Sequence, residues 1–73
     1  MAKSFGSWLK AQQHRDDPIG DLAQDFITAC KWRKENPERL GDDDVRFQMD
    51  CLSASVEAIR AFRQAKREWS ASR

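Results

Sequence analysis

The stretch DPIGDLAQDFITACKWRKENP, residues 17–37, contains the clearest helical pattern of this sequence. Asp17 followed by Pro18 is a strong start signal, because an aspartate accepts free backbone N–H groups and proline suits the first helical position. The apolar residues of the stretch recur at the spacing of one helix face: Ile19, Leu22, Ala23, Phe26, Ile27 and Cys30. Asn36-Pro37 ends the pattern, since a residue before proline is disfavoured in helical conformation. We expect this helix to be the centre of the core.

A shorter helix is predicted before it, from Ser4 to about His14. Ser4 is a suitable N-cap, and the apolar stripe consists of Phe5, Trp8 and Leu9. Gly6 lies inside this helix at a cost of roughly 1 kcal/mol relative to alanine. We therefore expect another segment to pack closely against Gly6.

The second half of the chain allows two helical arrangements. Gly41 and the aspartates at 42–44 predict the start of a third helix. Apolar residues then follow in one long series: Val45, Met49, Leu52, Val56, Ile59, Phe62 and Trp69. A single helix to about Ser70 would be roughly 40 Å long, which is too long for a small globule, and serines favour caps. We prefer a turn at Ser53–Ser55 and a last helix from about Val56 to Ser70.

Length and composition limit the chain to one domain, residues 1–73. A hydrophobic core of this size stabilises the folded state by about 3–5 kcal/mol, so the domain depends on well-packed helices. Cys30 and Cys51 are expected to be reduced core or near-core residues of a cytoplasmic protein, because the N-terminus has no apolar run of secretory length. No apolar stretch is long enough for a membrane helix, so a membrane partner is not expected.

Two segments carry a family resemblance. Residues 4–9, SFGSWL, and residues 15–23, RDDPIGDLA, resemble the N-terminal half of the YozE SAM-like family of small bacterial proteins. The second half matches the family loosely, and residues 31–52 depart from its pattern. The resemblance implies an all-α fold, a compact four-helix bundle of two helical hairpins similar to the sterile alpha motif. The family has no well-defined activity, so the resemblance implies a fold and not a function.

Residues for catalysis or cofactor binding are scarce. The chain has one histidine, no tyrosine, no glycine-rich phosphate loop and no paired ligands at zinc spacing. His14 is interpreted as a solvated residue at a helix end. The aspartates at 42–44 are interpreted as helix caps, since Val45 and Arg46 follow where a calcium loop needs spaced oxygen ligands. We predict a non-enzymatic protein without catalytic residues, cofactor or metal.

Trp32 lies off the main apolar stripe and has three basic neighbours. These neighbours are Lys31, Arg33 and Lys34. In one interpretation Trp32 covers an edge of the core. In the other it is an exposed aromatic anchor in a basic rim, a composition that binding hot spots favour.

Charge is distributed unevenly, although the net charge is only +1. Residues 35–57 carry −5 and residues 58–73 carry +4. The last helix contains the basic residues Arg60, Arg63, Lys66 and Arg67. They either form a solvated face paired with the acidic segment 42–50, or follow a phosphate backbone.

Two functions follow from these patterns. The first is a protein–protein interaction module, with an unidentified protein partner or with weak self-association of the aspartates at 42–44 against the basic last helix of a neighbour. The second is a nucleic-acid-binding or regulatory protein that uses the last helix and the edge at 31–34.

Overall fold

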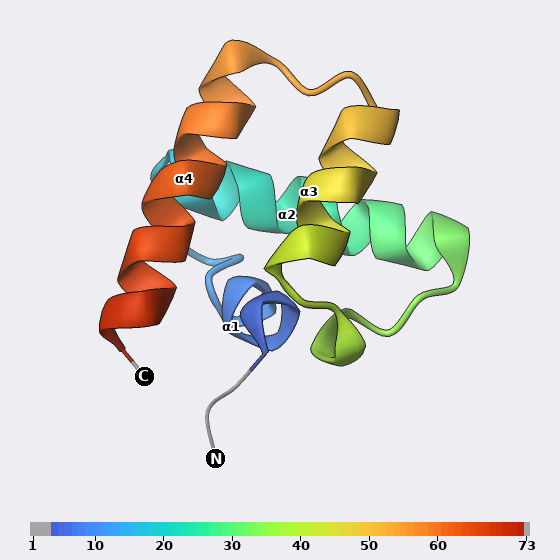
Figure 1. The fold of residues 1–73 in the computed structure, drawn as a ribbon, viewed down its shortest axis with the longest axis horizontal. Coiled ribbons are helices and arrows are strands. Elements are labelled where there is room, and N and C mark those ends of the chain that lie inside the picture. Colours follow the sequence, from blue (N-terminus) through green and yellow to red (C-terminus); the bar gives the residue numbers. More distant parts are fainter. Residues whose placement is uncertain (1–3, 73) are drawn as a thin grey trace.

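The described part of the chain, residues 4–72 of this computed structural model, folds into four α-helices and one short 3₁₀ turn. The helices are α1 (Phe5–Ala11), α2 (Pro18–Arg33), α3 (Asp42–Cys51) and α4 (Val56–Ala71), and the turn is η1 (Pro37–Arg39) (Figure 1). No strand occurs within these described residues. The expected all-α fold class is confirmed.

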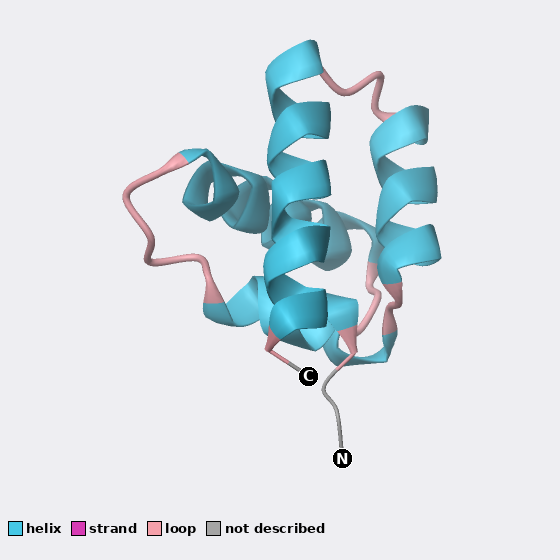
Figure 2. Ribbon diagram, turned by 60° about the vertical axis from the view of Figure 1, so that its left-hand side comes forward, coloured by secondary structure: helices cyan, strands magenta, loops and turns pink. Residues whose placement is uncertain are grey.

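α3 and α4 run side by side in opposite directions, and the turn at residues 52–55 joins them (Figures 1 and 2). Both helices cross α2, which packs mainly against α4. α1 lies across the lower part of the bundle and contacts η1 most extensively. The hairpin predicted from the two C-terminal helices is therefore present.

The core is centred on the predicted face of α2. Five residues of its stripe are buried and Ile27 is half-buried; the buried ones are Ile19, Leu22, Ala23, Phe26 and Cys30. Phe5 from α1 is fully buried, and its ring centroid lies 5.5 Å from that of Phe62 and 5.5 Å from that of Trp69. These edge-to-face contacts join the first helix to the last.

α1 is shorter than predicted, since it ends at Ala11 and not near His14. The backbone N–H of Gln12 donates to the carbonyl of Leu9 at 2.9 Å, and the backbone N–H of Arg15 donates to the carbonyl of Gln12 at 3.0 Å. Successive turns of this kind lead the chain into α2 within a few residues. The prediction for Gly6 is confirmed, because its N–H donates to the carbonyl of Leu40 at 2.8 Å and η1 leaves no space for a side chain.

α2 begins at Pro18 as predicted, and it ends at Arg33, a few residues before the predicted stop at Asn36-Pro37. The Asp17 carboxylate accepts the N–H of Gly20 at 3.0 Å, and it forms a salt bridge of 2.7 Å with Arg15. At the other end Lys34 adopts a left-handed conformation with φ 56°, and the N–H of Glu35 bonds to the carbonyl of Cys30 at 2.9 Å. These contacts form a Schellman motif, which satisfies the last free carbonyls of the helix.

The break between α3 and α4 is confirmed, but Cys51 and two members of the apolar series near it are exposed. Ser53 has φ 54°, and the hydroxyl of Ser55 caps α4 by accepting the N–H of Ala58 at 3.2 Å. The turn holds its flanking residues away from the core, so Leu52, Val56 and Cys51 are all exposed. The expectation that Cys51 lies in or near the core was wrong, whereas Cys30 is buried as predicted.

Candidate docking groove

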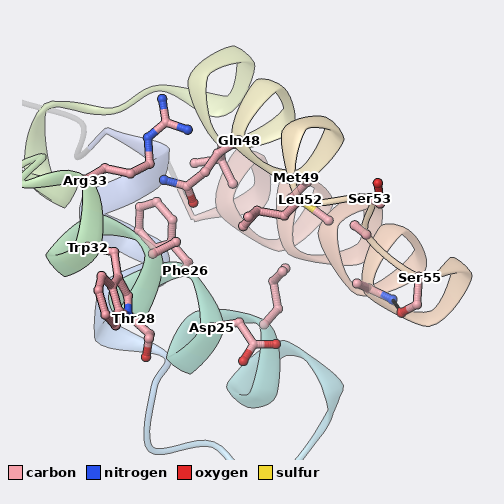
Figure 3. Close-up of a pocket in the computed structure, with 15 residues that line it drawn as sticks. Asp25, Phe26, Thr28, Trp32, Arg33, Gln48, Met49, Leu52, Ser53 and Ser55 are labelled. Atoms are coloured by element: carbon pink, nitrogen blue, oxygen red, sulfur yellow. Dashed lines mark hydrogen bonds between the residues drawn. The ribbon is translucent and has the colours of Figure 1, made fainter.

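An open apolar groove of about 510 Å³ lies between α2 and the α3–α4 hairpin (Figure 3). Its volume is within the range of about 300–1,000 Å³ that ligand-binding clefts show. α2 forms one side, and α3 with the turn at residues 53–55 forms the other. The apolar lining residues are Leu22, Phe26, Ala29, Trp32, Val45, Met49, Leu52, Ala54 and Ala58.

The groove follows from the way the helices pack. α2 packs against α4 and α1, whereas the closest helix packing of α3 is against α1. Side chains such as Phe26 and Met49 therefore bridge the space between α2 and α3, and they form a floor that is itself almost fully buried. The floor belongs to the core, while the upper walls stand in solvent.

Trp32 and Leu52 form the exposed upper walls. The exposed fraction is 84% for Trp32 and 63% for Leu52. Figure 3 shows them on opposite sides of the groove, Trp32 from the last turn of α2 and Leu52 from the end of α3. Large apolar side chains on both rims of an apolar hollow are typical of a surface that a partner covers.

One end of the groove is polar. Gln48 is only 4% exposed, and its amide Nε2 donates a weak hydrogen bond to Cys30 Sγ at 3.9 Å. Arg33 lies at the same end, where its Nε donates to the carboxylate of Glu35. Burial raises the pKa of the Cys30 thiol, so this sulfur stays neutral beside Gln48.

The structure separates the residues predicted around Trp32. Trp32 and Arg33 line the groove, and the interpretation in which Trp32 covers an edge of the core is wrong. Lys31 points elsewhere and lines a second, shallower hollow of about 330 Å³ together with His14. Lys34 is exposed at the end of α2.

The basic residues of α4 lie on a different surface. Arg60, Arg63 and Arg67, the α4 arginine row, are exposed and form no ion pair with any residue of the described range 4–72. Lys66 differs, because its ammonium lies 3.2 Å from the Asp42 carboxylate and 5.8 Å from the centre of the Phe62 ring. Of these four basic residues of α4, only Lys66 forms an ion pair with the acidic segment 42–50 within residues 4–72.

Several groove residues were not predicted as site residues. Met49 and Leu52 were predicted only as members of the apolar series, and Gln48 had no predicted role, but all three line the groove from α3 and its C-cap. The predicted turn beside Leu52 was a usable signal, because a large apolar residue next to a turn is easily held out of the core.

The described residues give few indications of other chemistry. Within residues 4–72 no three side chains among His, Cys, Asp and Glu gather closely enough to hold a metal ion. None of the helices in this range combines the length and apolar character needed to pass through a membrane. Compared with known protein families, curated proteins and solved structures, the chain has no match in any of the three.

Proposed function

We propose that this protein is a small non-enzymatic protein–protein interaction module that docks its partner in the groove between α2 and the α3–α4 hairpin. The observation that carries the proposal is the exposure of Trp32 and Leu52 on the two rims of an apolar groove. Tryptophan is among the residues that contribute most to binding at interfaces, and burial of a leucine side chain stabilises a complex by about 1.5–3 kcal/mol.

A matched pair of variants tests this docking surface. Leu52→Glu places a charge on the groove wall, whereas Val56→Glu places the same charge at an almost equally exposed apolar residue, 62% against 63%, outside the groove lining. The wild type and both variants are used to capture proteins from the native host's lysate after nuclease treatment. A captured protein is then purified, and its affinity for each of the three is measured by calorimetry.

We expect Leu52→Glu to weaken binding of the purified partner at least tenfold, because a buried unpaired charge is costly. Val56→Glu should bind like the wild type. Equal affinity of all three proteins would show that the partner does not use the groove.

The assignment to the cytoplasm and to the YozE SAM-like family belongs to the same proposal. Both cysteines are free thiols, which suits a reducing compartment. The helix containing Phe5 and Trp8 and the link into α2 carry the family resemblance, and both are ordered parts of the fold. A bacterial homologue with the same two segments and a known partner would test the family assignment.

The α4 arginine row supports a second candidate function, nucleic-acid binding. Its three guanidinium groups lie on one exposed helix face and are free to contact phosphates. We expect shifts of amide signals on α4 when duplex DNA or RNA is added at low salt, and loss of these shifts when the three arginines are replaced by glutamate. The control variant is Lys10→Glu with Arg39→Glu, two exposed basic residues outside α4. Unchanged α4 signals in the wild type would remove this candidate.

Weak self-association is a further form of the interaction proposal. Asp43 and Asp44 lie on an exposed face at the start of α3, whereas Asp42 is already paired with Lys66 and Asp50 with Arg46. Opposite charges on this face and on the α4 arginine row favour contact between two copies. Sedimentation from about 10 μM to 1 mM covers the range of such weak contacts. A constant monomer mass over this range would exclude self-association.

A further inference from the structure

The polar end of the groove contains hydrogen-bond donors that the fold does not use. The amide nitrogen of Gln48 has two hydrogens, and within residues 4–72 it forms one hydrogen bond, the weak one to Cys30 Sγ. Arg33 uses Nε for Glu35, and its two terminal nitrogens form no hydrogen bond within residues 4–72. The buried Gln48 amide and the Arg33 guanidinium both line the groove and both have unused donors, and Figure 3 shows the two side chains at the same end.

A carboxylate fits this end of the groove best. It is an acceptor-only group with two oxygens, and hydrogen bonds to it from arginine are roughly twice as strong as neutral ones. The Glu35 carboxylate accepts from Nε of Arg33, and within residues 4–72 the two terminal nitrogens at the outer edge of this guanidinium stay available. Asp25 lies at the opposite end of the groove. Its negative charge repels an acidic group of a partner there and attracts a basic one.

A helix fits the apolar part of the groove. Two helices form its sides. Residues 4–72 contain no strand, so they offer no sheet edge with which a partner strand could pair. A helix that lies between two others presents apolar residues at three- and four-residue spacing, which suits an apolar hollow with Trp32 and Leu52 on its rims.

We propose that the groove binds an amphipathic helix of a partner protein, whose apolar side chains lie between Trp32 and Leu52 and whose aspartate or glutamate side chain contacts Arg33 and Gln48. This inference rests on the proposed docking function and adds the chemistry and the orientation of the partner. The acidic end of the bound helix lies at Arg33, and its basic end lies at Asp25.

An unbiased peptide selection tests the partner's chemistry. A displayed library of random linear peptides of about 16 residues, long enough for four helical turns, is selected on the wild type, on Arg33→Glu and on Lys34→Glu. Lys34 is the control, because it is an exposed basic neighbour outside the groove lining. Circular dichroism of each variant first verifies that the helices are retained.

We expect peptides selected on the wild type and on Lys34→Glu to carry apolar residues at helical spacing and an acidic residue at one end. Peptides selected on Arg33→Glu should carry lysine or arginine at that position. A wild-type-selected peptide should bind Arg33→Glu at least tenfold more weakly, and it should shift the Trp32 indole and Met49 methyl signals of the wild type.

Three results would overturn the inference in distinguishable ways. If apolar helical peptides bind the groove without a preference for charge, the proposed contact of a partner carboxylate with Arg33 and Gln48 is wrong, and the docking function remains. If the selected peptides lack apolar residues at helical spacing, the proposal that the partner binds as a helix is wrong. If no selected peptide shifts the Trp32 or Met49 signals, both the inference and the docking groove are wrong.

Discussion

Gly6 shows how strongly a single residue constrains this fold. A Cβ atom at this position would lie 2.1 Å from the carbonyl oxygen of Pro37 and 2.7 Å from that of Leu40. Backbone atoms cannot move aside cheaply, so we expect Gly6→Ala to lower the free energy of unfolding by about 1–3 kcal/mol. Urea unfolding measures the change. Gly41→Ala is the control, because the nearest atom to its Cβ would be the Asp44 carboxylate at an ordinary 3.8 Å, and a loss there equal to that at Gly6 would contradict the explanation.

Arg15 makes the stability of the domain depend on acid pH. Its guanidinium bonds to Glu68 at 2.8 Å and to Asp17 at 2.7 Å. The Arg15 hydrogen bond lowers the pKa of Glu68, while the Gly20 N–H and then Arg15 lower the pKa of Asp17. Because both pKa values are depressed in the folded state, the stabilisation is present above the ordinary values of 3.8 and 4.5 and is lost as the pH falls through them to the folded-state values.

The measurement for this pH dependence is urea unfolding between pH 7 and pH 2.5, with Arg15→Met as the comparison. We expect the free energy of unfolding of the wild type to fall more steeply below about pH 5 than that of the variant, which lacks the arginine contacts. Parallel curves for the two proteins would show that Arg15 contributes nothing to acid sensitivity.

The C-terminal end of α2 yields a prediction at the scale of an element. Lys34 holds a left-handed conformation that a residue with a Cβ adopts at a cost of roughly 1–2 kcal/mol. Lys34→Gly removes this cost, so we expect the free energy of unfolding to rise by about 0.5–1 kcal/mol, allowing for the greater freedom of glycine in the unfolded chain. Lys34→Ala removes the same charge and retains the Cβ. Thermal melting of both variants distinguishes the two causes. An equal rise of the melting temperature in Lys34→Ala and Lys34→Gly would indicate an effect of the lost charge and not of the backbone conformation.

The whole molecule depends on few buried side chains. Its radius of gyration is 11.0 Å, close to the roughly 11 Å expected for a compact domain of this length, so the groove is a surface feature and not a sign of loose packing. Phe5 contacts the rings of Trp8, Phe62 and Trp69 across the bundle. Loss of one such side chain therefore affects the first and last helices together.

Phe5→Ala should leave the domain largely unfolded at 25 °C. Loss of a buried phenylalanine costs about 3–5 kcal/mol, which is comparable to the roughly 3–5 kcal/mol that a core of this size supplies. Phe47→Ala is the matched control, because Phe47 is 63% exposed and its loss should change stability by less than about 0.5 kcal/mol. The dispersion of amide proton signals reports folding, and a well-dispersed spectrum for Phe5→Ala would mean that the aromatic cluster is not essential.

Local signals in the sequence favoured four helices, and they indicated the start of α2, a stop before Pro37 and the buried face of this helix. Asp17-Pro18, Asn36-Pro37 and the serines at 53–55 act through the backbone of their own few residues, so they hold in any packing. Only the tertiary structure decided which apolar residues stay in solvent. Trp32, Leu52 and the buried Gln48 line one groove because α3 packs on α1 and leaves a space beside α2. That space depends on how helices distant in sequence cross one another, and the spacing of residues along one helix contains no such information.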